Sequence, residues 1–181
     1  PLVEISNLNV FFKNKSQAKE KFVRAVDNIS LEINKGEIMG VVGESGSGKS
    51  TLGRSILRLL PIQSGEIIFS GANLTALLPK ELREFRKKMQ MIFQDPYASL
   101  NPRMTVYETL AEPLIFHRLT NKKNITSRVT SLMNEVGLPQ NSMHKYPHEF
   151  SGGQRQRIAV GRAIGIKPEF IIADEPVSAL D

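Results

Sequence analysis

The sequence predicts an α/β fold in which helices pack on a mainly parallel β-sheet. Two short apolar runs, Ile38–Val42 and Phe170–Ala173, have the length and composition of buried strands. Each is followed by polar residues of the kind that bind ligands at the carboxyl end of a parallel strand. Between the two runs, residues 95–150 show helical spacing of apolar residues and no strand pattern. This order predicts a helical subdomain inserted into a strand–helix core.

The loop after the first run, Gly43–Ser50, matches the phosphate-binding pattern G-x-x-x-x-G-K-[ST] without substitution. Its glycines permit backbone angles at which successive N–H groups face a di- or triphosphate. Lys49 adds a charge that reaches the outer phosphates, and the Ser50 hydroxyl is placed to ligate Mg²⁺. A flexible Gly/Ser-rich turn is the alternative, but the flanking strand and helix favour a nucleotide site in a P-loop NTPase core. The predicted binding residues are Gly43, Glu44, Ser45, Gly46, Ser47, Gly48, Lys49, Ser50 and Thr51.

The first 94 residues are predicted to combine an antiparallel β subdomain with this core. Leu2–Phe12 and Phe22–Ile33 carry the alternating apolar residues of half-buried strands, and the Lys-rich segment 13–21 joins them as a loop. Leu52, Ile56, Leu59 and Leu60 follow helical spacing and predict a helix over residues 51–60. The remaining elements expected here are a strand at Glu66–Ser70, a turn at Gly71–Asn73, a basic helix at Pro79–Lys88 and a buried strand at Met89–Phe93.

The predicted helical subdomain has clear helix boundaries. Thr105 with Glu108 three residues later forms a capping box that begins one helix, and Pro113 is expected to kink or end it. A second helix begins near Asn124 and is stopped by Gly137. A third is expected from about Gly152 to Ile166, before the last strand.

The strand Phe170–Ala173 ends at two acidic residues. Asp174 is placed to hold Mg²⁺, directly or through water. Glu175 can accept a proton from, or orient, the water that attacks a terminal phosphate. An apolar run ending in two acids is weak evidence by itself, because strand ends often meet polar residues. The phosphate loop in the same chain favours the catalytic interpretation.

A second helix N-terminus with the character of an anion site lies at Ser151-Gly152-Gly153-Gln154. Ser151 is a good N-cap, and the two glycines let a ligand approach the backbone closely. By spacing alone, an ordinary capped helix is an equal alternative. One nucleotide site hardly needs two such helix ends from the same chain.

The amino-acid composition excludes several kinds of site and segment. The formal net charge is +6 and the sequence pI is near 9.7, but the basic residues are scattered in small clusters typical of a solvated surface. There are no cysteines, so disulfides and thiolate metal sites are excluded. No apolar stretch approaches the roughly 18 residues of a membrane span, and no signal peptide is recognised.

Taken in order, these motifs resemble those of ABC ATPases. Ser151-Gly152-Gly153-Gln154 is similar to the family's signature motif, Gln94 to its Q-loop, and Ser178-Ala179-Leu180-Asp181 to its D-loop. The longer stretches Gln94–Pro102 and Asp174–Asp181 resemble the oligopeptide/dipeptide importer branch. The resemblance covers the whole chain.

The resemblance implies an ATPase that uses ATP and Mg²⁺ and works as a head-to-tail dimer with a second ABC ATPase subunit, a paralogue in this branch. Each ATP would lie between one chain's phosphate loop and the other's signature, Ser151–Gln154. Gln94 would touch Mg²⁺ and the attacking water, and would join Glu175 and Lys49 as a catalytic residue. Phe12, or Phe11 next to it, would stack on adenine, although a plain core phenylalanine is an equal alternative.

The resemblance also implies partners and a location. Two transmembrane permease subunits would bind the loop after Gln94, and an extracytoplasmic substrate-binding protein would act through them. No nucleic acid partner is expected, and the subunit would lie peripherally on the cytoplasmic face of the cell membrane. The expected organisation is one nucleotide-binding domain with a β-subdomain and P-loop core at 1–94, a helical subdomain at 95–150, and the signature helix, Walker B strand and D-loop at 151–181.

The chain departs from the family pattern in two places. Phe150 replaces the usual leucine before the signature, an apolar exchange. The chain ends before the family's switch histidine, and none of His117, His144 and His148 stands in its place, so the domain is expected to be C-terminally truncated and poorly active alone. Two alternative functions are a soluble ABC ATPase acting on nucleic acid or ribosomes, and a nickel or glutathione importer ATPase of the same branch.

Overall fold

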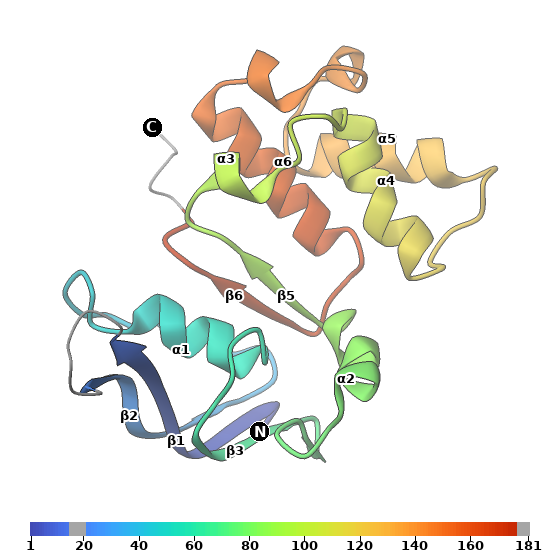
Figure 1. Ribbon diagram of the computed structural model, residues 1–181. Coiled ribbons are helices and arrows are strands. Elements are labelled where there is room, and N and C mark those ends of the chain that lie inside the picture. The colour runs from blue at the N-terminus through green and yellow to red at the C-terminus, as the bar shows by residue number, and fades with distance from the viewer. Residues whose placement is uncertain (15–20, 177–181) are drawn as a thin grey trace. The chain divides into compact units, whose positions relative to one another are not determined.

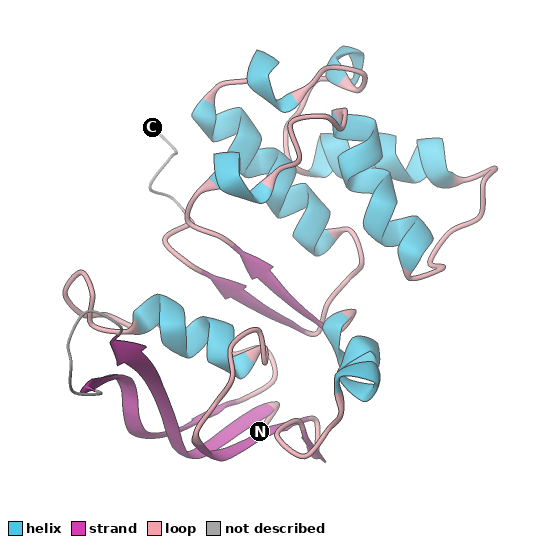
Figure 2. Ribbon diagram, viewed as in Figure 1, coloured by secondary structure: helices cyan, strands magenta, loops and turns pink. Residues whose placement is uncertain are grey.

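The computed structural model describes residues 1–14 and 21–176, which form two compact units, Pro1–Glu84 and Phe85–Asp181. Figures 1 and 2 show that the first unit contains most of the strands and the second most of the helices. Helix α2 (Pro79–Arg86) spans the boundary between them.

The first unit contains a four-stranded antiparallel sheet with the order β2-β1-β3-β4. Val3 shows the register, because it pairs with Ile33 of β2 on one side and with Phe69 of β3 on the other. The expected antiparallel subdomain is therefore confirmed, with β1 and β2 extending into the segment that we expected to be loop. The strands are β1 (Val3–Asn14), β2 (Lys21–Ile33), β3 (Ser64–Phe69) and β4 (Ala72–Asn73), the last within the expected turn.

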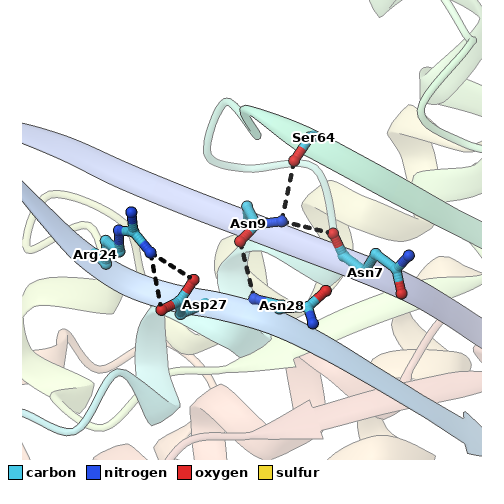
Figure 3. A network of polar contacts seen from close by, with 6 residues as sticks. All are labelled: Asn7, Asn9, Arg24, Asp27, Asn28 and Ser64. Atoms are coloured by element: carbon cyan, nitrogen blue, oxygen red, sulfur yellow. Dashed lines mark hydrogen bonds and ion pairs between the residues drawn. The ribbon is translucent and has the colours of Figure 1, made fainter.

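Asparagine side chains support the irregular centre of this sheet, where the pairing of β1 with both neighbours shifts register. Asn7 and Asn28 have left-handed backbones, with φ of 51° and 53°. The Asn9 side chain accepts from Asn28 N at 2.8 Å and donates to Asn7 O at 2.8 Å and to the Ser64 hydroxyl at 3.0 Å (Figure 3). These bonds satisfy polar groups that the strand ladder leaves unpaired at the shifts.

The segment Ile38–Val42 corrects our first expectation, because it is neither a strand nor buried. Ile38 is 98% and Val42 94% exposed. A strand obtains its backbone hydrogen bonds from a neighbouring strand, and no strand in the described part of the chain pairs with this segment. The helix after the phosphate loop, α1 (Lys49–Ile56), is confirmed but shorter than expected, and Leu59 lies exposed beyond its end.

The second unit contains the parallel pair β5 (Met89–Ile92) and β6 (Phe170–Ala173). Both strands were expected, and they pair with each other in parallel, as strands of a parallel sheet do. The burial expected for β6 is wrong, because Ile171 is 38% exposed. Within the described residues β6 has β5 as its only strand neighbour, so only part of its surface is covered.

Helices make up the rest of this unit and share one hydrophobic core, which joins α4 and α5 to α6. The expected helical content of 95–150 is confirmed. Pro113 lies inside α4 and does not end it, since the helix continues to Phe116. The elements are α3 (Pro96–Ser99), α4 (Val106–Phe116), α5 (Ile125–Glu135), η1 (Gln140–Ser142), η2 (Pro147–Glu149) and α6 (Gly152–Ile164).

The sheet of the first unit depends on a glycine at position 65. Gly65 has φ of +98°, and a Cβ there would lie 2.6 Å from both Asn7 O and Leu8 Cα. Gly71 has φ of +78° but open space around it. We expect Gly71→Ala to lower the free energy of unfolding by about 1 kcal/mol through backbone strain alone. Gly65→Ala should cost about 1–3 kcal/mol more, because backbone must also move.

Urea unfolding of the two variants beside the wild-type protein measures this difference. Equal losses of stability would show that the close approach of β1 to Gly65 is absent in solution.

The capping box of α4 is confirmed and makes stability depend on pH. The pKa of the Glu108 carboxyl lies below its ordinary value, first because it accepts from the backbone N–H of Thr105 at 2.7 Å and then from the Thr105 hydroxyl. A lowered pKa means that this stabilisation is complete above the ordinary pKa and is lost as the pH falls through the value in the folded protein.

We therefore expect wild-type stability to fall relative to Glu108→Gln as the pH drops from neutral to below about 4.3, the ordinary pKa of glutamate, because glutamine retains the cap without titrating. Urea unfolding of both proteins across this range tests it, and parallel pH profiles would contradict it.

Candidate nucleotide-binding and hydrolytic site

The phosphate loop has the backbone that its glycines predict. Gly46 and Gly48 have φ of +80° and +96°, in the left-handed region that other residues avoid. At Gly48 a Cβ would lie 2.1 Å from Ala25 O of β2, so only glycine fits between the loop and the sheet. Lys49 begins α1 directly after this turn.

Lys49 curls back over the loop that precedes it. Its Nζ donates to Gly43 O and to Glu44 O, both at 2.8 Å. These bonds fold the loop around the ammonium group and keep its positive charge beside the exposed backbone of residues 43–47. A charge at the start of a helix, bordered by a glycine-rich loop, is suited to the phosphates of a nucleotide. The loop therefore fits ATP.

The second unit brings Gln94 and Glu175 together at the carboxyl ends of β5 and β6. Gln94 Nε2 donates to Glu175 Oε2 at 2.5 Å. Asp174 is buried beside them, and its N–H donates to Ile92 O at 2.9 Å, which continues the parallel pairing one residue beyond β6. The predicted catalytic residues Gln94 and Glu175 thus lie at one strand edge with Asp174, where ligand-binding groups lie in parallel sheets.

Ser151 caps the N-terminus of α6. Its hydroxyl accepts from Gln154 N at 3.3 Å, and Gln154 Oε1 accepts from Ser151 N at 3.0 Å, which completes a capping box. Ser151 is exposed, and no atom would lie within 4 Å of a Cβ at Gly152. The helix N-terminus is therefore open for a ligand, as the signature resemblance implies.

The turn behind this helix end is held by Arg155. Its Nε donates to Pro147 O at 2.7 Å, and its guanidinium lies 3.6 Å from the centre of the Tyr97 ring. Tyr97 belongs to α3, which follows Gln94. Arg162, further along α6, donates to Ser99 O at 2.6 Å. Burial lowers the pKa of Arg162, while Glu112 opposes this effect. The segment after Gln94 is thus attached to the signature helix at two points.

The two phenylalanines considered for adenine differ in their surroundings. Phe12 is 41% exposed and pairs in register with Val23, which is 54% exposed. Phe11 is half-buried, and the Arg24 guanidinium lies 5.4 Å from its ring centre. A ring that stacks on a base must offer an open face, so exposure favours Phe12.

The residues predicted to hold Mg²⁺ all present oxygen atoms, the donors that this cation prefers. They are the Ser50 hydroxyl, the Asp174 carboxylate and the Gln94 side-chain carbonyl, whose amide nitrogen points to Glu175. Ser50 lies in the first unit and the other two in the second. Across residues 1–14 and 21–176 no cluster of three His, Cys, Asp or Glu side chains suits a metal ion. Each unit therefore contributes oxygen donors of the kind that Mg²⁺ prefers.

A family model described as ABC transporter matches residues 26–178, most of the chain. The chain belongs to the ABC transporter family.

Relatives of this ABC protein carry a more specific description. It is 54% identical over 181 residues to the oligopeptide transport ATP-binding protein OppF of Streptococcus mutans serotype c, covering 99% of this chain and 58% of that protein. It is 58% identical over 161 residues to OppF of Bacillus subtilis (strain 168), covering 88% of this chain and 53% of that protein. The chain thus spans about half the length of these curated relatives.

Solved ABC structures confirm the fold. A dimeric, post-hydrolysis form of the ATP-binding cassette MJ0796, bound to ADP and Pi, matches with a TM-score of 0.90 and 31% identity over 99% of this chain and 76% of that one. A second dimeric structure of MJ0796, described as a bacterial ABC transporter cassette, matches with a TM-score of 0.90 and 30% identity over the same shares. The P-loop NTPase fold expected from the sequence is therefore confirmed.

The sequence prediction missed Gln156, which contacts the end of the catalytic strand. Its Nε2 donates to Pro176 O at 3.0 Å. A signal existed, because Gln156 shares helical spacing with Ala159 and Ala163 on the buried face of α6. A polar residue in an apolar stripe is a candidate for a specific contact.

The D-loop and membrane-spanning segments were also considered in the sequence. The D-loop, Ser178–Asp181, lies outside the described residues. In the described part of the chain, no helix has the length and apolar character needed to span a membrane.

Proposed function

We propose that the protein is the ATP-binding and ATP-hydrolysing subunit that powers an ABC importer for oligopeptides or dipeptides. The main support for ATP hydrolysis is the contact of Gln94 with Glu175 beside Asp174. The same chain also has a complete phosphate loop. The names of its OppF relatives support oligopeptides as the transported class.

When bound, ATP supplies the terminal phosphoanhydride bond whose cleavage releases free energy. The loop N–H groups at 43–48 and Lys49 Nζ bind and orient the phosphates and offset their negative charge. Glu175 Oε2 accepts a proton from the attacking water, and Gln94 Nε2 fixes the orientation of that carboxylate through its hydrogen bond. Ser50, Asp174 and Gln94 would supply oxygen ligands for the Mg²⁺ that accompanies ATP.

The helix end at Ser151–Gln154 serves a second subunit in this proposal. The open space at Gly152 makes it a cover for the nucleotide of a head-to-tail partner, and the dimeric MJ0796 structures support the formation of a dimer. The partner is a related ABC ATPase, and two permease subunits and an extracytoplasmic binding protein complete the importer. The subunit works at the cytoplasmic face of the membrane.

We also propose the organisation expected from the sequence, with a β-subdomain and P-loop core at 1–94, a helical subdomain at 95–150, and the signature helix, strand and D-loop at 151–181. The helical segment between Gln94 and Ser151 then carries nucleotide state to the permease. The contacts of Arg155 with Tyr97 and of Arg162 with Ser99 O join the segment after Gln94 to helix α6, which gives this communication a physical path.

The role of Glu175 is tested by Glu175→Gln in the full natural chain, assembled with its partners. Glutamine retains the size and the contact with Gln94 but cannot take up the proton. We expect ATP turnover to fall about 100-fold or more while ATP stays bound and the dimer stays closed. Steady-state phosphate release and size-exclusion chromatography with ATP measure the two effects.

Lys49→Ala is the matched comparison, because it should weaken nucleotide binding itself. Unchanged turnover in Glu175→Gln would exclude Glu175 as the base. A wild-type complex that hydrolyses ATP in response to nucleic acid and not to peptide would contradict the importer assignment.

Phe12 is tested against Phe11. We expect Phe12→Ala to weaken ATP binding about 5- to 100-fold, through the loss of a stacked ring. Phe11→Ala should leave ATP affinity near that of wild type and lower stability, because the Phe11 ring contacts Arg24. Titration with a fluorescent ATP analogue measures affinity. A larger loss of affinity in Phe11→Ala would assign the base to Phe11.

A further inference from the structure

Gln156 is an almost completely buried polar side chain on α6, with 1% of its surface exposed. Its Nε2 donates to Pro176 O at 3.0 Å. Its Oε1 is also buried and has no hydrogen-bond partner among residues 1–14 and 21–176. Burying an acceptor without a partner costs stability, so an apolar side chain of the same size would suit packing better. The glutamine therefore has a role beyond filling space.

The backbone held by this bond is strained. Glu175 has φ of +45°, in the left-handed region where its Cβ crowds the backbone, and the proline that follows restricts it further. Such a conformation persists only where surrounding contacts hold it, and it is found most often at functional sites.

Contacts from two sides hold this strained residue. Asp174 N, just before it, donates to Ile92 O at 2.9 Å, and Gln94 holds the Glu175 carboxylate at 2.5 Å. Gln156 supplies the third contact, on the backbone just after it. The first two contacts come from β5 and its end, and the third comes from α6. Glu175 is thus held between the strand pair and the signature helix.

We propose that Gln156 is a positioning residue that holds Glu175 in place for hydrolysis by anchoring the backbone at Pro176. This inference rests on the proposed role of Glu175 as the base. Gln156 lies two residues after Gln154 and about 200° around the helix from it. One face of α6 is therefore open to a ligand at its N-terminus, while another holds the catalytic strand of its own chain.

In the proposed dimer this arrangement has a consequence for coupling. The N-terminus of α6 serves the nucleotide of the partner subunit, and Gln156 connects the same helix to Glu175. A small displacement of α6 moves the Pro176 carbonyl and with it the carboxylate. The helix thereby links occupancy of one nucleotide site to the geometry of the base in the other.

The test is Gln156→Met in the full natural chain within its complex. Methionine has nearly the same size and shape but lacks both the donor and the unpartnered acceptor. We expect kcat for ATP to fall about 10- to 100-fold through misplacement of the base, with KM for ATP unchanged and Tm equal or higher. Gln156→His, whose Nε2 stands the same number of bonds from Cα, should recover part of kcat.

Gln140→Met is the matched control. Gln140 is exposed, and its Nε2 also makes one hydrogen bond, to Asn134 Oδ1 at 3.1 Å. The exchange removes a comparable contact away from the proposed site, so kcat, KM and Tm should all remain at wild-type values.

A measurement without nucleotide separates this inference from the proposed function. In the free full-length chain, the backbone amide resonance of Glu175 should shift in Gln156→Met and stay in place in Gln140→Met. A wild-type complex without ATPase activity would contradict the proposed function, and the Glu175 resonance would still decide whether Gln156 positions that backbone.

Two outcomes would overturn the inference. One is wild-type kcat in Gln156→Met with an unmoved Glu175 resonance. The other is a loss of Tm and ATP affinity in step with kcat, which would make Gln156 an ordinary contributor to the core.

Discussion

The parallel pairing of β5 with β6 is the constraint on which the hydrolytic half of the site depends. Ile92 pairs with Ala173, and the next rung joins Asp174 N to Ile92 O. This register places the residues that follow each strand side by side, so that Gln94 meets Glu175 across 81 positions of sequence. A shift of one residue would turn the acidic side chains to the opposite face of the sheet. The contact between these two side chains therefore depends on the backbone hydrogen bonds that pair the two strands.

Helix α6 connects this strand edge to the rest of the second unit. Its apolar side chains, such as Ile158, share a core with α4 and α5. Its arginines bind the segment after β5, through the Tyr97 ring and Ser99 O. The same helix therefore carries both the open N-terminus at Ser151 and the contacts with the strand edge and the helical segment.

In the phosphate loop, the local backbone conformation and the packing against a distant strand both require glycine at the same position. Left-handed backbone at Gly48 is a local requirement, but the absence of space for a side chain comes from Ala25 on β2. Lys49, bonded to Gly43 O and Glu44 O, holds the loop in a curled form. The loop is thus prepared for phosphate by contacts inside the chain, which reduces the ordering that binding requires.

Short-range patterns in the sequence determined the phosphate loop, the capping boxes at Thr105 and Ser151, and the order of strands and helices, because glycines, caps and apolar periodicity act over a few residues. The apolar run 38–42 resembles β6 in sequence, yet only β6 has a strand partner among the described residues, since such a partner comes from a distant part of the chain. For the same reason, Gln156 was not identified as a functional residue from the sequence. Its role depends on Pro176, and only tertiary packing of α6 against the end of β6 brings a buried amide to that carbonyl.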